Sequence, residues 1–172
     1  MKNPKDTLIV MTELIQITDA NNLGNLHGGR LMYWMDICSG ISASKLAERP
    51  AVTASVDNVS FREPIHVGDV VTIESRVTRT FRTSMEVYLE VWVHKDYGKH
   101  RVKSNDAYYT FVCLDQEGRP TPINDEIKPE SEHELKLYDG ALRRRQVRLV
   151  LGGRMRVEDA NELKALFFHD KQ

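Results

Sequence analysis

The 172-residue sequence has little cysteine, no long apolar run and no excess of charge of either sign. Its two cysteines, Cys38 and Cys113, lie far apart and outside any CxxC motif, so neither a disulfide framework nor a zinc knuckle is indicated. No apolar stretch approaches the ~18–20 residues that span a bilayer, and the short run after the N-terminus lacks the core of a signal peptide. A net charge of −1 argues against a protein whose main role is to bind the nucleic-acid backbone. We therefore expect a cytoplasmic protein that has neither nucleic acid nor membrane as a partner.

The motifs of several enzyme classes are also missing. The six histidines show no HExxH or other metal-ligand spacing, so we predict no metal site. No GxSxG motif occurs, and the SxxK match at Ser42–Lys45 lacks the SDN and KTG motifs of penicilloyl-type serine enzymes. The glycine pair at Gly28–Gly29 belongs to neither a Walker A loop nor a Rossmann fingerprint. We expect no cofactor.

The hydrophobic pattern, in contrast, is clear. An apolar run within residues 7–17 predicts a strand. Residues 30–48 are apolar with few gaps and are followed by Pro50, which predicts a buried helix. Beyond Pro50 the hydrophobic period changes to two, which predicts four strands joined by turns. These strands lie at residues 52–60, 71–77, 85–94 and 101–114.

One buried helix against an antiparallel sheet is an α+β arrangement. One sheet covers only one side of a helix, and this helix is apolar almost all round, so we expect a second copy of the chain to cover it. The charged segment 130–149 predicts a further helix, and residues 157–169 predict a short amphipathic one. We accordingly expect a domain at residues 1–125 and a helical extension at residues 126–172.

A glycine-containing loop, Asn25-Leu26-His27-Gly28-Gly29, opens directly onto the predicted buried helix. A helix N-terminus presents unpaired N–H groups and the positive end of the helix dipole, and glycines let a ligand approach them closely. This combination suits a carbonyl oxygen that gains negative charge. The alternative is that Gly28 and Gly29 only shape a tight turn. His27 is a candidate acid or base, or it orients the loop.

Asp36 is the second candidate, because almost all of its neighbours are apolar. A carboxylate in such a setting is costly unless it has a partner, which makes Asp36 a candidate general base; the alternative is a narrow solvated strip on the helix. Asp36 lies ~12 Å along the helix from Gly28 at 1.5 Å per residue. It cannot reach a carbonyl at its own helix N-terminus. If both take part in one reaction, Asp36 comes from the antiparallel helix of a second protomer.

Asn25-Leu26-His27-Gly28-Gly29 followed by Trp34-Met35-Asp36 resembles the hotdog-fold acyl-CoA thioesterases, above all the cytosolic and small bacterial acyl-CoA hydrolases. The resemblance covers roughly residues 8–123, with supporting stretches at 54–57, 67–70, 82–85, 90–93 and 109–112. It implies a hotdog fold, in which a long sheet wraps a central helix, and dimers that assemble into hexamers. It also implies hydrolysis of acyl-CoA to a free acid and CoA, so that CoA is part of substrate and product and not a cofactor.

The resemblance further implies a role for each candidate residue. Asn25 of one protomer and Asp36 of another would share one site. Gly28 or Gly29, with His27, would polarise the thioester carbonyl, while Asn25 positions the water or the carbonyl and Asp36 acts as base or nucleophile. The implied CoA groove is lined by Ala54, Ser55, Val56, Thr83, Ser84 and Met85. The implied partners of the CoA phosphates are Arg82 and one of Arg144 or Arg145.

Three other functions stay open from the sequence. The first is a hotdog dehydratase that uses His27 as the base on a 3-hydroxyacyl thioester. The second is an acyl-CoA sensor without catalytic activity, and the third is a structural or interaction protein.

Overall fold

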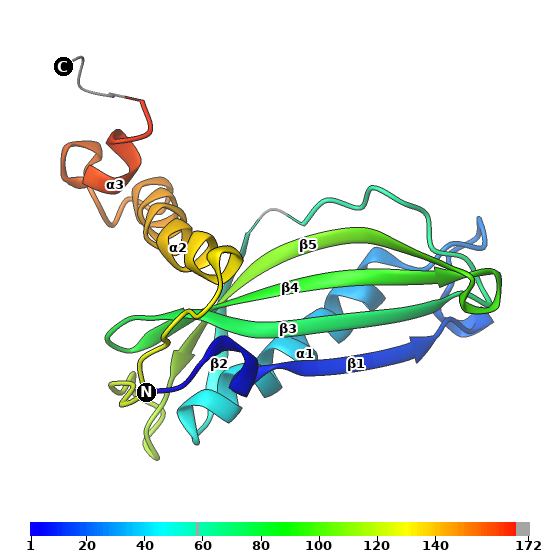
Figure 1. The fold of residues 1–172 in the computed structure, drawn as a ribbon, viewed down its shortest axis with the longest axis horizontal. Helices are drawn as coiled ribbons and strands as arrows, with labels where there is room; N and C mark the ends of the chain where they lie inside the picture. Colours follow the sequence, from blue (N-terminus) through cyan, green and yellow to red (C-terminus); the bar gives the residue numbers. More distant parts are fainter. Residues whose placement is uncertain (58, 168–172) are drawn as a thin grey trace. The chain divides into compact units, whose positions relative to one another are not determined.

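A five-stranded antiparallel sheet and one long helix form the first part of the chain (Figure 1). The computed structural model describes residues 1–57 and 59–167, and the chain divides into two compact units, Met1–Lys128 and Pro129–Gln172. The first unit contains helix α1, Gly28–Ala47. Its strands are β1 (Ile9–Leu14), β2 (Ala51–Asp57), β3 (Val70–Thr80), β4 (Ser84–Lys95) and β5 (His100–Cys113).

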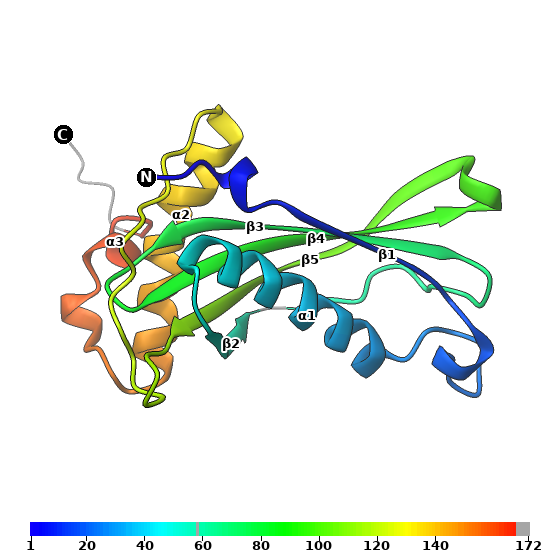
Figure 2. The same ribbon diagram turned by 90° about the horizontal axis from the view of Figure 1, so that it is seen from below.

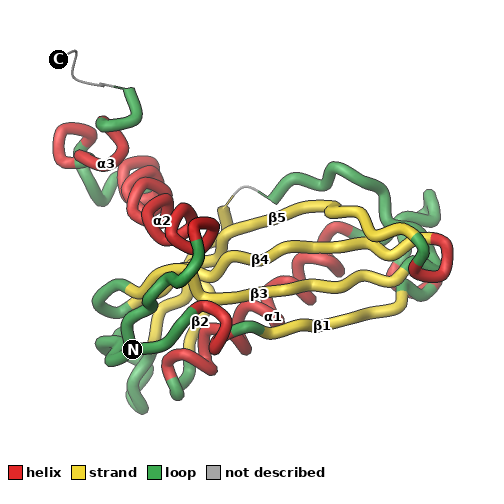
Figure 3. The backbone as a smooth tube through the Cα atoms, viewed as in Figure 1, coloured by secondary structure: helices red, strands yellow, loops and turns green. Residues whose placement is uncertain are grey.

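The strands, yellow in Figure 3, follow the order β1-β3-β4-β5-β2, and all neighbours are antiparallel. The predicted turns connect β3 to β4 and β4 to β5, and in each case the two strands are also neighbours in the sheet. β2 instead lies beside β5 at the edge of the sheet. This is possible because a long segment joins β2 to β3 and reverses at Gly68, whose φ is +91°.

Helix α1 lies on one face of the sheet and contacts all five strands (Figure 2). The side of the sheet that faces α1 is apolar. On β4, for example, every second side chain points toward the helix, and these side chains are apolar, as the hydrophobic period of two predicts. The fully buried residues of this alternation are Met85, Val87, Leu89, Val91 and Val93. The buried side of α1 includes Leu31, Met35 and Cys38. The helix and the apolar strand faces together make the core.

The other side of α1 is apolar and exposed. Met32, Tyr33, Ile37 and Ile41 are between 36% and 56% exposed. On the edge strand β2 two further apolar side chains are exposed, those of Val52 and Val56. The sheet of one protomer therefore leaves part of the helix uncovered, as the sequence pattern predicts.

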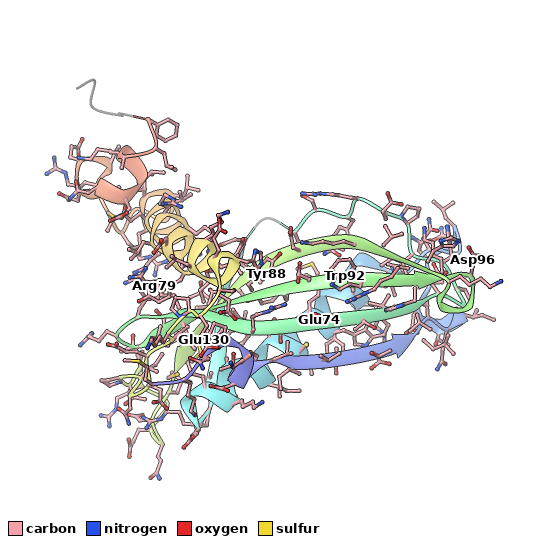
Figure 4. The ribbon with its side chains drawn as sticks, in the orientation of Figure 1. Glu74, Arg79, Tyr88, Trp92, Asp96 and Glu130 are labelled. Atoms are coloured by element: carbon pink, nitrogen blue, oxygen red, sulfur yellow. The ribbon has the colours of Figure 1, made fainter. Side chains whose placement is uncertain are left out.

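The opposite face of the sheet is polar. Figure 4 labels Glu74, Tyr88 and Trp92 on this face. Lys103 Nζ donates to Glu90 at 2.9 Å and to the Tyr88 hydroxyl at 3.0 Å. The guanidinium of Arg101 lies 4.2 Å from the centre of the Trp92 ring. Ion pairs and a cation–π contact therefore stabilise this face of the sheet, whereas the face against α1 is stabilised by apolar packing.

The second unit begins with helix α2, Glu132–Leu151, close to the predicted range. Ser131 and Glu134 form a capping box, in which the Ser131 hydroxyl accepts from the Glu134 N–H at 3.2 Å. The predicted helix at 157–169 is shorter in the structure, where α3 spans only Asn161–Lys164. Its N-cap, Ala160, has no side chain that could accept a hydrogen bond. The last two residues of that prediction lie outside the described residues. None of the described helices is long and apolar enough to cross a membrane.

Candidate active site

The loop before α1 is tied to the helix by Asp19. Its carboxylate accepts hydrogen bonds from Arg30 Nε at 2.8 Å and from the Gln16 N–H at 3.0 Å. The Arg30 guanidinium, helped by the Gln16 N–H, lowers the pKa of this nearly buried carboxyl below its ordinary value. The Asp19 carbonyl also accepts from the His27 N–H at 2.9 Å. One buried aspartate thus fixes both ends of the loop that leads into α1.

Within this loop, Asn21 and Asn25 play different parts. The Asn21 side-chain oxygen accepts from the N–H groups of Leu23 at 2.9 Å and Asn25 at 3.2 Å, and the turn continues through Gly24 at a φ of +75°. The Asn25 side-chain oxygen is buried and has no hydrogen-bond partner among the described residues. Asn21 therefore shapes the turn, while Asn25 presents an unsatisfied polar group.

A pocket of about 370 Å³ lies at the N-terminus of α1. Its lining residues are Asn25, Leu26, Gly28, Leu31, Phe61, Arg62, Glu63, Pro64 and Ile65. A Cβ atom at Gly28 would lie 3.3 Å from the Phe61 ring, so a side chain there would push this half-exposed ring outward by a few tenths of an ångström. Arg62 supplies a cation that the sequence reasoning missed, because nothing in its local pattern separates it from other surface arginines.

The helix end beside this pocket remains electrically positive. The first turn of α1 contains no acidic residue, and its N-cap, His27, makes no side-chain capping bond. The N–H groups of the first turn and the helix dipole therefore remain available to an oxyanion. The structure brings together Asn25 and Gly28 at the pocket. His27 is exposed, and Gly29 faces open space.

Asp36 lies elsewhere, about two turns further along α1. The Thr53 hydroxyl of β2 donates to its Oδ1 at 2.6 Å. Tyr109 of β5 is buried nearby, and burial together with the negative charge of Asp36 raises the pKa of Tyr109 to about 12. We call Asp36, Thr53 and Tyr109 the Asp36 cluster. Asp36 does not line the pocket at Gly28, so one protomer carries the two groups of residues at separate places.

The residues expected to bind CoA are spread over two strands and α2. Ala54 and Val56 are exposed on β2, and Ser55 between them is half-buried. Arg82 is exposed in the turn before β4, and Thr83 and Ser84 follow it. The Met85 side chain is fully buried in the core, so none of its atoms lines the protomer surface. Arg144 and Arg145 lie on α2 in the second unit, where burial and the nearby Arg148 lower the pKa of Arg145.

Across residues 1–57 and 59–167, no group of three or more His, Cys, Asp or Glu side chains could hold a metal ion. The chemistry available at the pocket and at the Asp36 cluster is therefore that of a helix N-terminus, amides, a carboxylate and hydroxyl groups.

The sequence model of the thioesterase superfamily matches residues 23–98. A Bacillus subtilis protein named as an uncharacterized acyl-CoA thioester hydrolase is 37% identical over 140 residues, which are 81% of this chain and 81% of that protein. This chain belongs to the acyl-CoA thioester hydrolase family. The rat cytosolic acyl coenzyme A thioester hydrolase is also 37% identical over 133 residues, but the match covers only 34% of that longer protein.

Solved structures of this family share the fold. A crystal structure of an apo-hexameric acyl-CoA thioesterase is 33% identical, with a TM-score of 0.82 over 86% of this chain and 94% of that chain. The acyl-CoA hydrolase of Staphylococcus aureus in complex with butyryl coenzyme A, coenzyme A and coenzyme A disulfide is 29% identical. Its TM-score is 0.82 over 97% of this chain and 99% of that chain. The predicted family and hotdog fold are confirmed.

The same Staphylococcus aureus enzyme has also been solved with an asparagine, an aspartate and a threonine each replaced by alanine, at TM-scores of 0.80 to 0.82. The sequence separations of those three residues equal the separations of Asn21, Asp36 and Thr53 in this chain. Asn25 does not have this spacing. The sequence reasoning therefore missed Asn21 and Thr53 as candidates; the turn formers around Asn21 were visible, but Thr53 gives no local signal.

Proposed function

We propose that this protein hydrolyses fatty acyl-CoA to a free fatty acid and CoA, in sites that are each built from two protomers. The observation that carries this proposal is the separation of the pocket from the Asp36 cluster along one helix. A general base must come within about 3 Å of the proton that it abstracts, and Asp36 is ~12 Å along α1 from Gly28. A second protomer with an antiparallel α1 would bring its Asp36 to the pocket.

In the proposed reaction the thioester carbonyl lies at the N-terminus of α1. The N–H of Gly28 or Gly29 donates to the carbonyl oxygen, and the helix dipole stabilises the negative charge that develops on it. His27 adds polarity at the mouth of the site. Asp36 of the partner accepts a proton from water as the water oxygen bonds to the carbonyl carbon. The tetrahedral intermediate then collapses, the carbon–sulfur bond breaks, and CoA leaves as a thiolate that takes up a proton.

Asn21 and Asn25 are the two candidates for the asparagine that orients the water or the carbonyl. Asn25 offers an unsatisfied amide oxygen at the pocket, whereas the spacing shared with the Staphylococcus aureus enzyme supports Asn21. Separate Asn21→Ala and Asn25→Ala variants distinguish them. Replacement of the asparagine that orients the water or the carbonyl should lower kcat. Replacement of the asparagine that shapes the turn should lower the thermal stability of the protein.

We also propose that β2 and the exposed side of α1 form the dimer contact, and that three dimers make a hexamer. The exposed apolar side chains of α1 and β2 support this, since an edge strand with such neighbours is suited to pairing with another chain. Hexameric structures among the family neighbours support the larger assembly. A cytoplasmic location is proposed from the cytosolic relative.

The direct test is release of free CoA from acyl-CoAs of C2 to C16, followed with a thiol reagent. We expect release by the wild type and a loss of about 10²–10⁴-fold in kcat for Asp36→Ala. The control is Asp139→Ala at an exposed position of α2, which should match the wild type. Light scattering verifies that each variant keeps its oligomeric state.

Two results would overturn this function. CoA binding without thiol release at any chain length would indicate a sensor. An unsaturated thioester product formed from a 3-hydroxyacyl-CoA would indicate a dehydratase.

A further inference from the structure

Tyr109 carries an unsatisfied hydroxyl in the interior of the first unit. The residue is only 1% exposed, and its hydroxyl has no hydrogen-bond partner among the described residues. A buried hydroxyl without a partner costs about 1–3 kcal/mol, and Tyr109 shares this state with other buried polar atoms of the described residues, among them the Asn25 amide oxygen at the pocket. A tyrosine at this place therefore calls for a functional explanation, since phenylalanine would fill the same space without that cost.

The surroundings of Tyr109 converge on the Asp36 cluster. On β5, Tyr109 stacks on Phe111, with 6.3 Å between ring centres, and Phe111 pairs with Thr53 of β2. The Phe111 ring also lies 3.6 Å from where a Cβ on Gly40 of α1 would stand, which places this face of β5 against the helix. Thr53 in turn donates to Asp36. Thr53 and Asp36 are thus in direct contact, Tyr109 is connected to them through Phe111, and the charge of Asp36 also acts on Tyr109.

The hydroxyl groups of Thr53 and Tyr109 differ in whether their proton is already used in a hydrogen bond. The Thr53 hydroxyl already donates to Oδ1 of Asp36, so Oδ2 remains for another donor. The Tyr109 hydroxyl donates to no described residue. Because its pKa is raised to about 12, it keeps its proton at any working pH and is always a donor.

We propose that Tyr109 is a positioning residue that holds the hydrolytic water beside Asp36. The proposal rests on the thioester hydrolysis described above. The Tyr109 hydroxyl donates to one lone pair of the water, and the water donates one hydrogen to Asp36. The second lone pair of the water forms the bond to the thioester carbonyl carbon. The proton passes to Asp36, the electron pair of the carbon–sulfur bond leaves with CoA, and Tyr109 keeps its own proton throughout.

The test is Tyr109→Phe, which removes the hydroxyl and keeps the ring. Misplacement of a reacting group by about 1 Å can cost 10²-fold in rate. We expect kcat for CoA release to fall about 10-fold or more, with KM within about twofold of the wild type. The matched control is Tyr108→Phe, the adjacent residue on the opposite face of β5, whose ring lies 5.0 Å from the Tyr88 ring. That control should keep the wild-type kcat.

A second measurement does not depend on how much of the variant folds. With hydroxylamine present, the enzyme divides the acyl group between free acid and hydroxamate, and a reaction without enzyme corrects for the background. Hydroxylamine is the stronger nucleophile and depends less on positioning than water does. We therefore expect the ratio of hydroxamate to acid to rise in Tyr109→Phe and to stay at the wild-type value in Tyr108→Phe.

Two results would overturn the role of Tyr109. One is a Tyr109→Phe variant with wild-type kcat and an unchanged product ratio. The other is a shift in the preferred chain length with full kcat on the best substrate, because that would make Tyr109 a wall of the acyl site. The proposed function is tested separately, since its test uses the products that the wild type forms and does not involve Tyr109→Phe.

Discussion

The hydrogen bond from Thr53 to Asp36 orients a carboxylate on a helix side that is otherwise apolar. At 2.6 Å it is short, as bonds to ionised acceptors are. Without it, the Asp36 side chain would rotate among several rotamers, and the fraction in the productive one would fall. We expect Thr53→Val to lower kcat about 10- to 100-fold. Thr53→Ser keeps the hydroxyl and should restore most of the activity.

Steady-state CoA release by these two variants measures the effect. A Thr53→Val enzyme with wild-type kcat would mean that Asp36 is positioned by other contacts, for example by the second protomer.

The Asp19–Arg30 pair should make part of the stability depend on pH. The pKa of Asp19 lies below its ordinary 3.8 in the folded protein, because Arg30 and the Gln16 N–H both stabilise the charged form. A lowered folded pKa adds stability above the unfolded pKa, and this stability is lost as the pH falls through the folded pKa. Asp19→Asn should therefore lower the free energy of unfolding by about 1–2 kcal/mol at pH 7.

This difference between wild type and Asp19→Asn should remain constant from pH 7 to about 4 and then shrink. Urea unfolding at a series of pH values measures it. A difference that stays the same at pH 3 would assign the effect to packing of the loop and not to ionisation.

At the residue scale, the sequence predicts some of the site and not the rest. Asp36 is recognisable because it interrupts an apolar helix, and Gly28 because a glycine pair stands at the start of that helix. Thr53 and Tyr109 are not recognisable. Each is an ordinary strand residue, and its importance comes from contacts with elements distant in the chain.

Among the elements, α1 depends on a residue far from it in sequence. Lys2 Nζ donates to the carbonyls of Leu46 at 3.1 Å and Lys45 at 3.3 Å, and to the Glu48 carboxylate at 2.8 Å. A cation at a helix C-terminus satisfies its last carbonyls and offsets the negative end of the dipole. We expect Lys2→Met to lower the free energy of unfolding by about 1 kcal/mol. Lys99→Met, in the exposed turn between β4 and β5, should have no measurable effect.

Urea unfolding at low and high salt completes this test. The difference for Lys2→Met should decrease at high salt because the ion pair and the dipole are screened. A loss that is independent of salt would indicate packing of the lysine stem instead.

The elements themselves were predicted well wherever their hydrophobic pattern extends over many residues. The helix at 30–48 and the strand at 85–94 correspond to α1 and β4. The edge position of β2 could not be predicted, because strand partners are chosen by the whole fold and a long connection leaves the choice open. The helix α3 begins later than predicted, after a 3-10 turn at Val157–Asp159, and its N-cap position, Ala160, has no side chain that could cap it.

At the scale of the whole molecule, a shared site predicts complementation between inactive variants. Asp36→Ala supplies an intact pocket, and Asn25→Ala, or Asn21→Ala if that residue proves to be the catalytic asparagine, supplies an intact Asp36. In a mixed dimer one of the two sites is wholly wild type and the other is doubly altered. Random pairing should therefore restore about a quarter of the wild-type activity, because half of the dimers are mixed.

Co-expression with two different tags and purification on both isolates the mixed assemblies. Hexamers of randomly paired dimers should then keep about a quarter of the wild-type activity, and isolated mixed dimers about half. Mixing two preparations of Asp36→Ala is the control and should remain inactive. A mixed assembly as inactive as its parents would place all catalytic groups within one protomer.

The edge position of β2 also has a consequence for inhibition. Among the described strands β2 has a neighbour, β5, on one side only, and an extended peptide can add to such an edge as an extra strand. A peptide that copies the sequence of β2 would compete with the second protomer for this edge. Such a compound would abolish turnover without entering the pocket, and acyl-CoA at high concentration would oppose it only indirectly, because acyl-CoA binds the site that two protomers form and so stabilises their assembly.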